Sequence, residues 1–358
     1  MKKIRVAIAG ASGYAGAELV RLAALHPHFE LCAVTSEKSA GVPVASVFPS
    51  LAGLVHLSFQ ALSPECLAEM ADAVFLALPH TKSLTPVAAC IQTGKLVVDL
   101  SADYRLKDPA LYEQWYKTPH THAGLLKDAV YGLPELHRTA IAKARLVASP
   151  GCYPTAAVLQ LAPLFAQNLV DSQGNIIIDA KSGISGAGRS PALPYHFPEA
   201  HESLEAYKVG QHRHTPEIEQ ELAGLLRRVS QPSETDAAPP IVTFTPHLVP
   251  MNRGILSTAY CRLKRPTALS ELRDLYRTYY KGERFVRVQD DIMPNPRYIK
   301  GSNYCDIGVY LDPRSQSVIT VAALDNLVKG AAGQAIQAMN LMLGFPEETG
   351  LTAPAAYP

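Results

Sequence analysis

The sequence predicts an α/β protein, with a doubly wound parallel sheet followed by a second α+β domain whose sheet is largely antiparallel. Three observations predict this fold class. The chain has 358 residues, more than a single hydrophobic core usually serves. Short apolar strands alternate with helical stretches up to residue 150. After Gly151 the strands become longer and are joined by long loops, which indicates a second domain.

The first part of the chain contains five short apolar or β-branched segments with the composition of buried strands. They are Ile4–Ala9, Leu31–Thr35, Ala73–Leu78, Lys95–Leu100 and Leu146–Ala148. Long helical or loop stretches separate most of them. Parallel strands need such long, right-handed connections, so the alternation predicts parallel pairing.

The second part mixes helices, longer strands and polar loops. Thr215 and Pro216 predict the start of a helix, with Thr215 as N-cap, and Asp325 is predicted to cap the last helix. The predicted elements are a helix at Pro154–Gln167, a strand at Asn175–Asp179, a Gly/Ser/Pro-rich stretch at Ser182–Pro198, an exposed loop at Ser230–Pro240, strands at Ile241–Pro246, Ile255–Leu263, Cys305–Leu311 and Ser317–Ala323, and a helix at Asp325–Met342.

Composition excludes several classes of function. Lys and Arg number 33 against 32 Asp and Glu, which gives no general attraction to nucleic acid or to an anionic membrane. No apolar run is long enough for a membrane span, and the N-terminal segment does not resemble a signal peptide. The six cysteines are widely separated, which predicts free thiols in a reducing cytoplasm and no structural zinc. They are Cys32, Cys66, Cys90, Cys152, Cys261 and Cys305.

A glycine-rich turn lies between the first predicted strand and the helix after it. Its residues are Gly10, Ala11, Ser12, Gly13, Tyr14, Ala15 and Gly16. Glycine allows the backbone to turn tightly and to approach a pyrophosphate, and the helix N-terminus supplies free N–H donors. Glycines also serve close packing alone, but this position between strand and helix favours dinucleotide binding.

The end of the second predicted strand indicates which dinucleotide binds. NAD-preferring sites place an acidic side chain there, to hold the ribose 2′-hydroxyl. Here Ser36, Lys38 and Ser39 are suited to a 2′-phosphate, whereas Glu37 is contrary evidence. The segment favours NADP.

Cys152 differs from the other five cysteines because Pro and Gly residues surround it just before a predicted helix. A helix N-terminus favours thiolate over thiol, and thiolate is the nucleophile. The other five are interpreted as small apolar residues in or beside strands and helices. A thiolate together with a nicotinamide cofactor indicates interconversion of an aldehyde and an acyl group through a thioester.

Two further segments supply candidates for proton transfer and anion binding. His212 and His214 flank Arg213 before a helix start and could act in acid–base chemistry, although solvated histidines or a metal site are alternatives. Arg105 follows the predicted strand Lys95–Leu100 and could bind a phosphate, or it could pair with a neighbouring Asp. The Gly/Ser loop Ser182–Arg189 allows close approach to a ligand or is a flexible connection.

A rival enzyme class, the short-chain reductases, uses a Tyr-x-x-x-Lys pair. Its one match is Tyr260 and Lys264, in a strand-like stretch where the two side chains lie too far apart to cooperate. A non-catalytic NADP-sensing protein is a rival of another kind, and it would need no reactive thiol.

Together these motifs resemble the N-acetyl-gamma-glutamyl-phosphate reductases of arginine biosynthesis, a family similar in fold to the aspartate-semialdehyde dehydrogenases. The matching segments are GASGYAGAELVRL, DLSADYRL, YGLPEL, SPGCYPTAA, SGISGAGR, HRHTPEI, TPHLVPMNRGI, CDIG and DNLVKGAAGQAIQ. The resemblance implies a discontinuous Rossmann-type NADP-binding domain, residues 1–151 and 322–358. It also implies a catalytic domain, residues 152–321, that makes the contacts of a homodimer or homotetramer.

The resemblance also implies residue roles. Cys152 would be the nucleophile and His212 the acid–base residue, while Arg105, His214 and Arg189 would bind an acyl phosphate substrate. The residues implied at the cofactor are Gly10, Ser12, Gly13, Tyr14, Ala15, Gly16, Ser36, Lys38, Ser185, Gly186 and Asn326. Relatives that act on carrier-bound aminoadipyl phosphate in lysine synthesis share most of the pattern, so the substrate stays open between the two.

Overall fold

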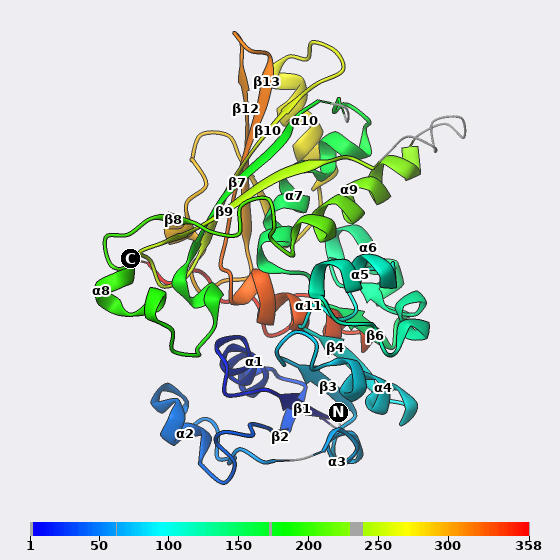
Figure 1. Cartoon of the computed structure of the whole chain (residues 1–358), viewed down its shortest axis with the longest axis vertical. Coiled ribbons are helices and arrows are strands. Elements are labelled where there is room, and N and C mark those ends of the chain that lie inside the picture. The colour runs from blue at the N-terminus through cyan, green and yellow to red at the C-terminus, as the bar shows by residue number, and fades with distance from the viewer. Residues whose placement is uncertain (1–2, 62, 172–173, 230–238, 358) are drawn as a thin grey trace. The chain divides into compact units, whose positions relative to one another are not determined.

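The computed structural model describes residues 3–61, 63–171, 174–229 and 239–357 (Figure 1). The chain forms two compact units. Unit 1 comprises residues 1–151 and 331–353, and unit 2 comprises residues 152–330 and 354–358. Each unit is built around its own sheet.

The sheet of unit 1 is entirely parallel, in the order β2-β1-β3-β4-β6-β5. Its strands are β1 (Ile4–Ala9), β2 (Phe29–Val34), β3 (Ala73–Leu76), β4 (Leu96–Asp99), β5 (Val130–Tyr131) and β6 (Leu146–Ala148). The chain leaves β1 for β2 on one side and returns to β3 on the other. The carboxyl ends of β1 and β3 therefore form the topological switch point at which open α/β sheets bind ligands.

Helices cover both faces of this sheet. They are α1 (Tyr14–Leu25), α2 (Val44–Val47), α3 (Pro64–Met70), α4 (Leu84–Gln92), α5 (Pro109–Tyr116), α6 (Pro134–Ile141) and α11 (Gly333–Met342), with 3-10 turns η1 (Pro49–Leu51) and η2 (Ala123–Lys127). Helices α1 and α11 pack together, and α11 also contacts β4 and α6, whereas α3 and α4 pack on each other and on the strands. Helix α11 is thus a late segment of the chain that packs into a core otherwise built from residues 1–151.

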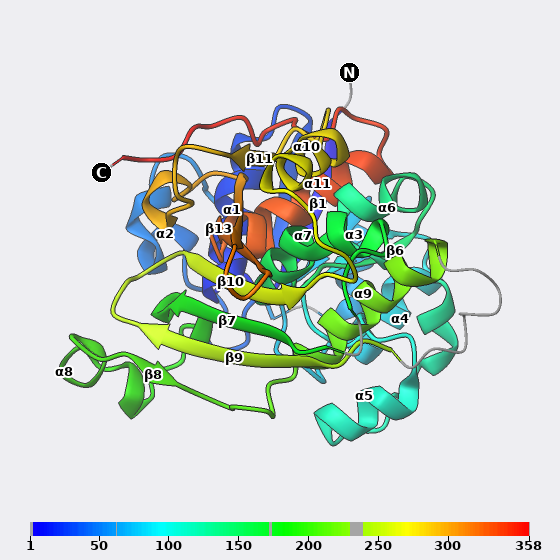
Figure 2. The same cartoon turned by 90° about the horizontal axis from the view of Figure 1, so that it is seen from above.

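The sheet of unit 2 is mixed and mostly antiparallel, in the order β11-β12-β13-β10-β7-β9-β8. Its strands are β7 (Ile176–Gly183), β8 (Glu205–Ala206), β9 (Val242–Val249), β10 (Ile255–Arg262), β11 (Val286–Gln289), β12 (Cys305–Asp312) and β13 (Ser317–Leu324). Among the described strands of this sheet, only the pairs β11–β12 and β7–β9 are parallel, and β7 and β9 run side by side in Figure 2. The predicted fold class is confirmed.

One face of this second sheet is covered by helices. The helical segments of unit 2 are α7 (Cys152–Ala166), α8 (Phe197–Ala200), α9 (Thr215–Val229) and α10 (Leu269–Tyr279), with 3-10 turns η3 (Ile184–Ala187), η4 (Leu193–Tyr195) and η6 (Pro296–Tyr298) and the π-helical turn η7 (Val328–Ala332). Helix α7 packs on β10, β13 and α9. Every side chain of α7 from Tyr153 to Phe165 is buried, so the helix is fixed from all sides.

Several predicted elements differ from those observed. The short strands β5, β8 and β11 are too brief to show alternation, and the sequence did not indicate them. Thr215 is the first helical residue of α9, not its cap, and its hydroxyl is buried without a hydrogen-bond partner among the described residues. The helix predicted at Asp325–Met342 is the turn η7 followed by α11. The predicted loop Ser230–Pro240 lies, for residues 230–238, outside the described part of the chain.

No helix within the described residues is both long and apolar enough to cross a membrane. Within the same residues, no group of three or more His, Cys, Asp or Glu side chains is arranged to hold a metal ion.

Candidate active site

The glycine turn joins β1 to α1 in unit 1. Gly10 has φ +75°, and a Cβ there would lie 2.4 Å from the carbonyl oxygen of Ala77, just after β3. A Cβ at Gly16 would lie 2.3 Å from the carbonyl oxygen of Gly10. Helix α1 begins at Tyr14, and its N-cap Gly13 makes no side-chain capping bond. The backbone N–H groups of its first turn, at Tyr14, Ala15 and Gly16, are suited to a pyrophosphate at the switch point.

The end of β2 lies beside this turn. The hydroxyl oxygens of Ser12 and Ser36 are 2.7 Å apart, and Ser36 Oγ also accepts a hydrogen bond from the N–H of Ser39 at 3.3 Å. Glu37 and Lys38 are exposed. Hydroxyls from the glycine turn and from the second strand therefore meet at the position where the ribose of a bound dinucleotide is expected.

Arg105 lies in the loop after β4 and is almost fully buried. Its Nε donates to the carbonyl oxygen of Ser149 and its Nη2 to that of Leu100, both at 2.8 Å. These two bonds connect the loops after β4 and β6, and they fix the guanidinium at the carboxyl edge of the sheet. Asp103, a proposed alternative partner, is engaged by the N–H groups of Thr81 and Ser83 and by the hydroxyl of Tyr112.

Asp99 ends β4 and begins the same loop. Its carboxylate accepts hydrogen bonds from the N–H and the hydroxyl of Ser101, at 3.1 and 2.6 Å. The side chain is completely buried, and burial raises the pKa of Asp99 to about 6, against hydrogen bonds from Ser101 that lower it. The negative charge of Asp103 raises this pKa further.

Cys152 is the first residue of α7 in unit 2 and is half-buried. Cys152 therefore lies at a helix N-terminus, as predicted. The helix begins at Cys152 itself, two residues before the predicted start at Pro154. Among the other cysteines, Cys90, Cys261 and Cys305 are buried as expected, and Cys32 is half-buried. Cys66 is exposed, so its interpretation as a buried residue was wrong.

His212 lies in an aromatic enclosure next to the start of α7. Its ring makes edge contacts with Tyr153, Tyr207 and Phe244, at centroid distances of 5.7, 5.5 and 5.4 Å, and with His214 at 4.7 Å. The N–H of His214 donates to His212 Nδ1 at 3.1 Å, which leaves the ring proton on Nε2.

The enclosure keeps His212 neutral. Burial, together with the positive charges of Lys208 and Arg213, lowers the pKa of His212 to about 3. At neutral pH the imidazole is therefore a neutral N–H donor and not an imidazolium acid.

Tyr207 is a site residue that the sequence did not indicate. Its hydroxyl donates to the hydroxyl of Tyr153 at 3.3 Å, and Tyr153 donates to the carbonyl oxygen of His247 at 3.1 Å. Burial raises the pKa of Tyr207, and the negative charge of a Cys152 thiolate adds to this increase. The edge strand β8, paired with β9, carries the chain to Tyr207, whose N–H donates to the carbonyl oxygen of Pro246.

Ser185, Gly186 and Asn326 meet in one hydrogen-bonded corner of unit 2. Asn326 Nδ2 donates to Ser185 Oγ at 3.0 Å, and its Oδ1 accepts from the N–H of Gly254 at 2.7 Å. A Cβ at Gly186 would lie 2.7 Å from Ser182 Oγ, so a side chain there would require the Ser182 hydroxyl to move. Arg189 follows in the same loop and is exposed.

The predicted site residues thus form two groups, one in each unit. Unit 1 contains the glycine turn with Ser12 and Ser36 in contact, the exposed Lys38, and the anchored Arg105. Unit 2 contains Cys152, the neighbouring His212 and His214, and the corner formed by Ser185, Gly186 and Asn326.

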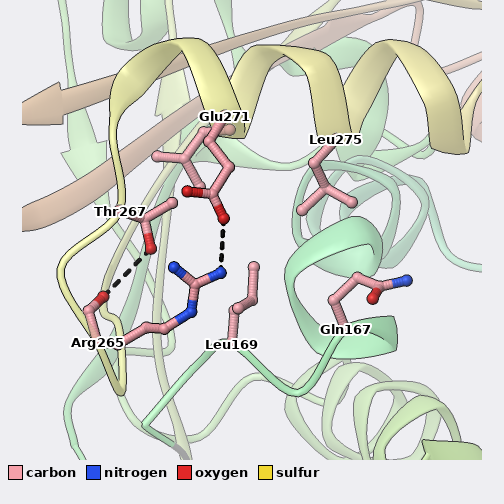
Figure 3. Close-up of a pocket in the computed structure, with 7 residues that line it drawn as sticks. Gln167, Leu169, Arg265, Thr267, Glu271 and Leu275 are labelled. Carbon is pink, nitrogen blue, oxygen red and sulfur yellow. Dashed lines mark hydrogen bonds and ion pairs between the residues drawn. The ribbon is translucent and has the colours of Figure 1, made fainter.

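A surface hollow of unit 2 is lined by none of these residues (Figure 3). It lies between the end of α7 and the start of α10, and an ion pair between Arg265 and Glu271 crosses it. Its other lining residues are Gln167, Leu169, Thr267, Leu272 and Leu275. Because the two charges compensate each other, the hollow has no side chain suited to an anionic substrate.

Comparison with known proteins defines the class. Residues 5–144 match the family model of the semialdehyde dehydrogenase NAD-binding domain, and residues 152–326 match that of the semialdehyde dehydrogenase dimerisation domain. The fold agrees with crystal structures of aspartate semialdehyde dehydrogenases. The enzyme II of Vibrio cholerae has a TM-score of 0.70 at 15% identity and covers 96% of this chain and 99% of its own. The NADP-bound enzyme of Candida albicans has a TM-score of 0.69 at 16% identity, with the same coverage. The chain is thus an enzyme of the semialdehyde dehydrogenase class, with a nicotinamide-dinucleotide-binding domain.

Full-length relatives narrow the class further. The N-acetyl-gamma-glutamyl-phosphate reductase of Heliobacterium modesticaldum is 50% identical over 99% of this chain and 100% of its own length. Those of Symbiobacterium thermophilum and Geobacter metallireducens are 51% and 50% identical, again over 99% of this chain and 99% and 100% of theirs. The chain belongs to the N-acetyl-gamma-glutamyl-phosphate reductase family, which confirms the resemblance seen in its motifs.

Proposed function

We propose that this enzyme reduces N-acetyl-L-glutamyl 5-phosphate to N-acetyl-L-glutamate 5-semialdehyde and phosphate, with NADPH and through a thioester on Cys152, in arginine biosynthesis. The relatives' names support the substrate. The observation that carries the mechanism is the position of Cys152 as the first residue of α7, beside the aromatic enclosure of His212. A non-catalytic NADP sensor would need neither feature.

Cys152 begins the reaction. The N–H groups and dipole of the α7 N-terminus favour its thiolate. The thiolate attacks the acyl carbon and a carbon–sulfur bond forms. The carbon–oxygen bond to phosphate breaks with its electron pair on the phosphate, which takes up one proton from solvent and leaves as hydrogen phosphate. We assign the phosphate group to Arg105, because the carbonyl oxygens of Ser149 and Leu100 hold its guanidinium at the carboxyl edge of the sheet and a guanidinium is suited to bidentate binding of an anion. His214 and Arg189 complete the binding of the substrate.

His212 acts at the carbonyl oxygen. As a neutral imidazole with its proton on Nε2, it donates a hydrogen bond to the negative charge that develops there. NADPH, when bound, supplies the hydride that reduces the thioester. The resulting thiohemiacetal collapses to the aldehyde and regenerates the Cys152 thiolate.

The residues of unit 1 suit a dinucleotide phosphate. A Cβ at Gly10 or Gly16 would overlap backbone atoms of Ala77 or of Gly10, so both glycines are needed for the tight turn from which α1 begins and at whose N-terminus we place the pyrophosphate. We assign the ribose 2′-phosphate to Ser36 and Lys38, together with Ser12. Ser185, Gly186 and Asn326 would hold the nicotinamide end.

The proposal also covers the domains of the chain and its oligomeric assembly. We propose that unit 1 is the cofactor domain, that unit 2 is the catalytic domain, and that the enzyme is a homodimer or homotetramer. The boundary implied by the resemblance, at residue 322, falls within β13, which pairs along its length with β10 and β12 of unit 2. The match of residues 152–326 to a dimerisation domain supports the assembly. The free cysteines support a reducing, cytoplasmic setting.

The test is the reverse reaction, phosphate-dependent reduction of NADP by N-acetylglutamate semialdehyde. We expect turnover with this aldehyde and at least ten-fold lower kcat/KM with the aminoadipate and aspartate semialdehydes. Preference for a carrier-bound aminoadipate semialdehyde would instead assign the enzyme to lysine synthesis. Cys152→Ala should abolish turnover while NADP binding persists, and near-normal turnover of this variant would exclude the thioester.

A further inference from the structure

Gly330 lies directly against Cys152. A Cβ at Gly330 would lie 2.8 Å from the Cβ of Cys152 and 3.2 Å from its Cα, closer than side chains ordinarily approach. Gly330 does not have a left-handed backbone conformation, since it is absent from the residues with positive φ among those described. Its missing side chain therefore serves the contact with Cys152 and not the backbone angle.

The position of Gly330 is fixed by the π-helical turn η7. The N–H of Gly330 donates to the carbonyl oxygen of Asp325 at 2.9 Å, five residues back along the chain, which is the spacing of a π-helix. Such wide turns in helices occur frequently at functional sites. The turn presents the backbone of Gly330 to Cys152 where a regular helix would present a side chain.

Asp325 fixes the start of this turn. Its buried carboxylate accepts hydrogen bonds from the N–H groups of Leu327 and Val328, and from the N–H of Gly301. Arg253 pairs with the same carboxylate at 3.1 Å. The turn therefore has little freedom to move away from Cys152.

Cys152 has equally little freedom on its side, because α7 is buried along its length from Tyr153 onward. A methyl group at Gly330 would have to be accommodated by displacement of the Cα–Cβ bond of Cys152, because it would meet these two atoms and rotation about their bond moves neither. Displacement of a reacting atom by about 1 Å can reduce a rate by about 100-fold.

We infer that Gly330 is a positioning residue for the nucleophile: its bare backbone on the π-turn sets where the Cys152 sulfur points. This inference rests on the proposed role of Cys152. The inference predicts that Gly330→Ala displaces the Cys152 thiol. The matched control is Gly224→Ala. Gly224 is also a helical glycine without positive φ in unit 2, but a Cβ there would meet nothing within 4 Å.

The first measurement is kinetic and chemical. For Gly330→Ala we expect kcat to fall 10- to 100-fold with KM for NADPH within two-fold, and Gly224→Ala to match the parent enzyme. Alkylation by iodoacetamide across pH 5–9, followed by mass spectrometry of the Cys152 peptide, should give a changed rate profile. The exposed Cys66 in the same molecule is the reference thiol. An unchanged Cys152 profile and a kcat within two-fold of the parent would overturn the inference.

Alkylation needs no substrate, so it distinguishes this inference from the proposed function. The parent enzyme could fail to reduce the acyl phosphate while the alkylation profile of Cys152 still changes in Gly330→Ala. That result would refute the proposed function and would still support the positioning of Cys152 by Gly330.

The second measurement is a double-mutant cycle in thermal stability. Cys152→Gly removes the Cβ that a side chain at Gly330 would meet. We expect the Tm loss of Gly330→Ala to fall by at least half in the Cys152→Gly background. If Gly330→Ala is insoluble, recovery of soluble protein in the double variant supports the contact. Equal losses in both backgrounds, or an insoluble double variant, would refute it.

Discussion

Replacement of Asp99 by Asn tests whether a buried carboxyl makes the stability of unit 1 depend on pH. Burial raises the pKa of Asp99 from 3.8 to about 6. The folded state then binds a proton that the unfolded state has lost between about pH 4 and pH 6. The free energy of unfolding therefore falls as pH rises through this window. Two pKa units at about 1.4 kcal/mol each give a loss of up to ~3 kcal/mol, complete near pH 7.

Asp99→Asn removes this titration while its carbonyl oxygen still accepts the N–H of Ser101. We expect the variant to match the parent enzyme near pH 4 and to be more stable by about 1–3 kcal/mol at pH 7 to 8. Urea unfolding at half-unit pH intervals, followed by tryptophan fluorescence of Trp115 in α5 of unit 1, measures the difference. A difference between variant and parent that does not change with pH would refute the reasoning, because the two curves must diverge between pH 4 and 6.

Three further predictions concern the site itself. Gly10→Ala should lower the free energy of unfolding by about 1–3 kcal/mol more than Gly41→Ala in urea titrations, because both positions have positive φ but only Gly10 would bring a Cβ against the Ala77 carbonyl; equal losses would contradict this. Ser36→Asp should shift cofactor preference from NADP toward NAD by at least ten-fold in the ratio of kcat/KM values, because a carboxylate repels a 2′-phosphate and binds a 2′-hydroxyl. His212→Gln should lower kcat by about 10²–10³-fold, the cost of removing one fixed hydrogen-bond donor to a developing oxyanion. Because the pKa of His212 is about 3, the imidazole is neutral above that pH, so kcat/KM of the parent should show no inflection near pH 6.5 that is absent from the variant.

The sequence predicted those parts of the candidate site that are formed by consecutive residues. The glycine turn is recognisable because the strand, the three glycines and the helix are consecutive. Cys152 is recognisable because Pro and Gly precede a helix whose N-terminus it occupies. In both cases the functional geometry is made by one continuous segment, and a pattern of residue types therefore carries it.

The parts that the sequence did not predict depend on pairing between distant segments. Tyr207 belongs to a stretch without periodicity, and it reaches the enclosure only because β8 pairs with β9, about 40 residues later. Gly330 stands in an apolar run that resembles an ordinary helix, and its role follows from contact with Cys152. The short strands β5, β8 and β11 were missed because they are defined by the strands with which they pair, whereas β6 is equally short but is entirely apolar and was predicted. The roles of such residues become visible only when their contacts in the folded structure are known.

The neutrality of His212 fits the proton balance of the proposed reaction. A cysteine that is used as a thiolate and released as a thiolate gives no proton to a base in any cycle. The one proton that the proposed reaction consumes is taken up by the departing phosphate and can come from solvent, so an imidazolium partner of the thiolate is not required. The α7 N-terminus can stabilise the sulfur's negative charge alone, whereas a buried imidazolium beside Lys208 and Arg213 would be strongly disfavoured. What the chemistry does require is a donor at the carbonyl oxygen when charge gathers there, and a neutral Nε2–H held by the His214 N–H supplies it without any change of protonation. The aromatic enclosure that lowers the basicity of His212 is therefore consistent with catalysis, because it selects the one protonation state that this reaction uses.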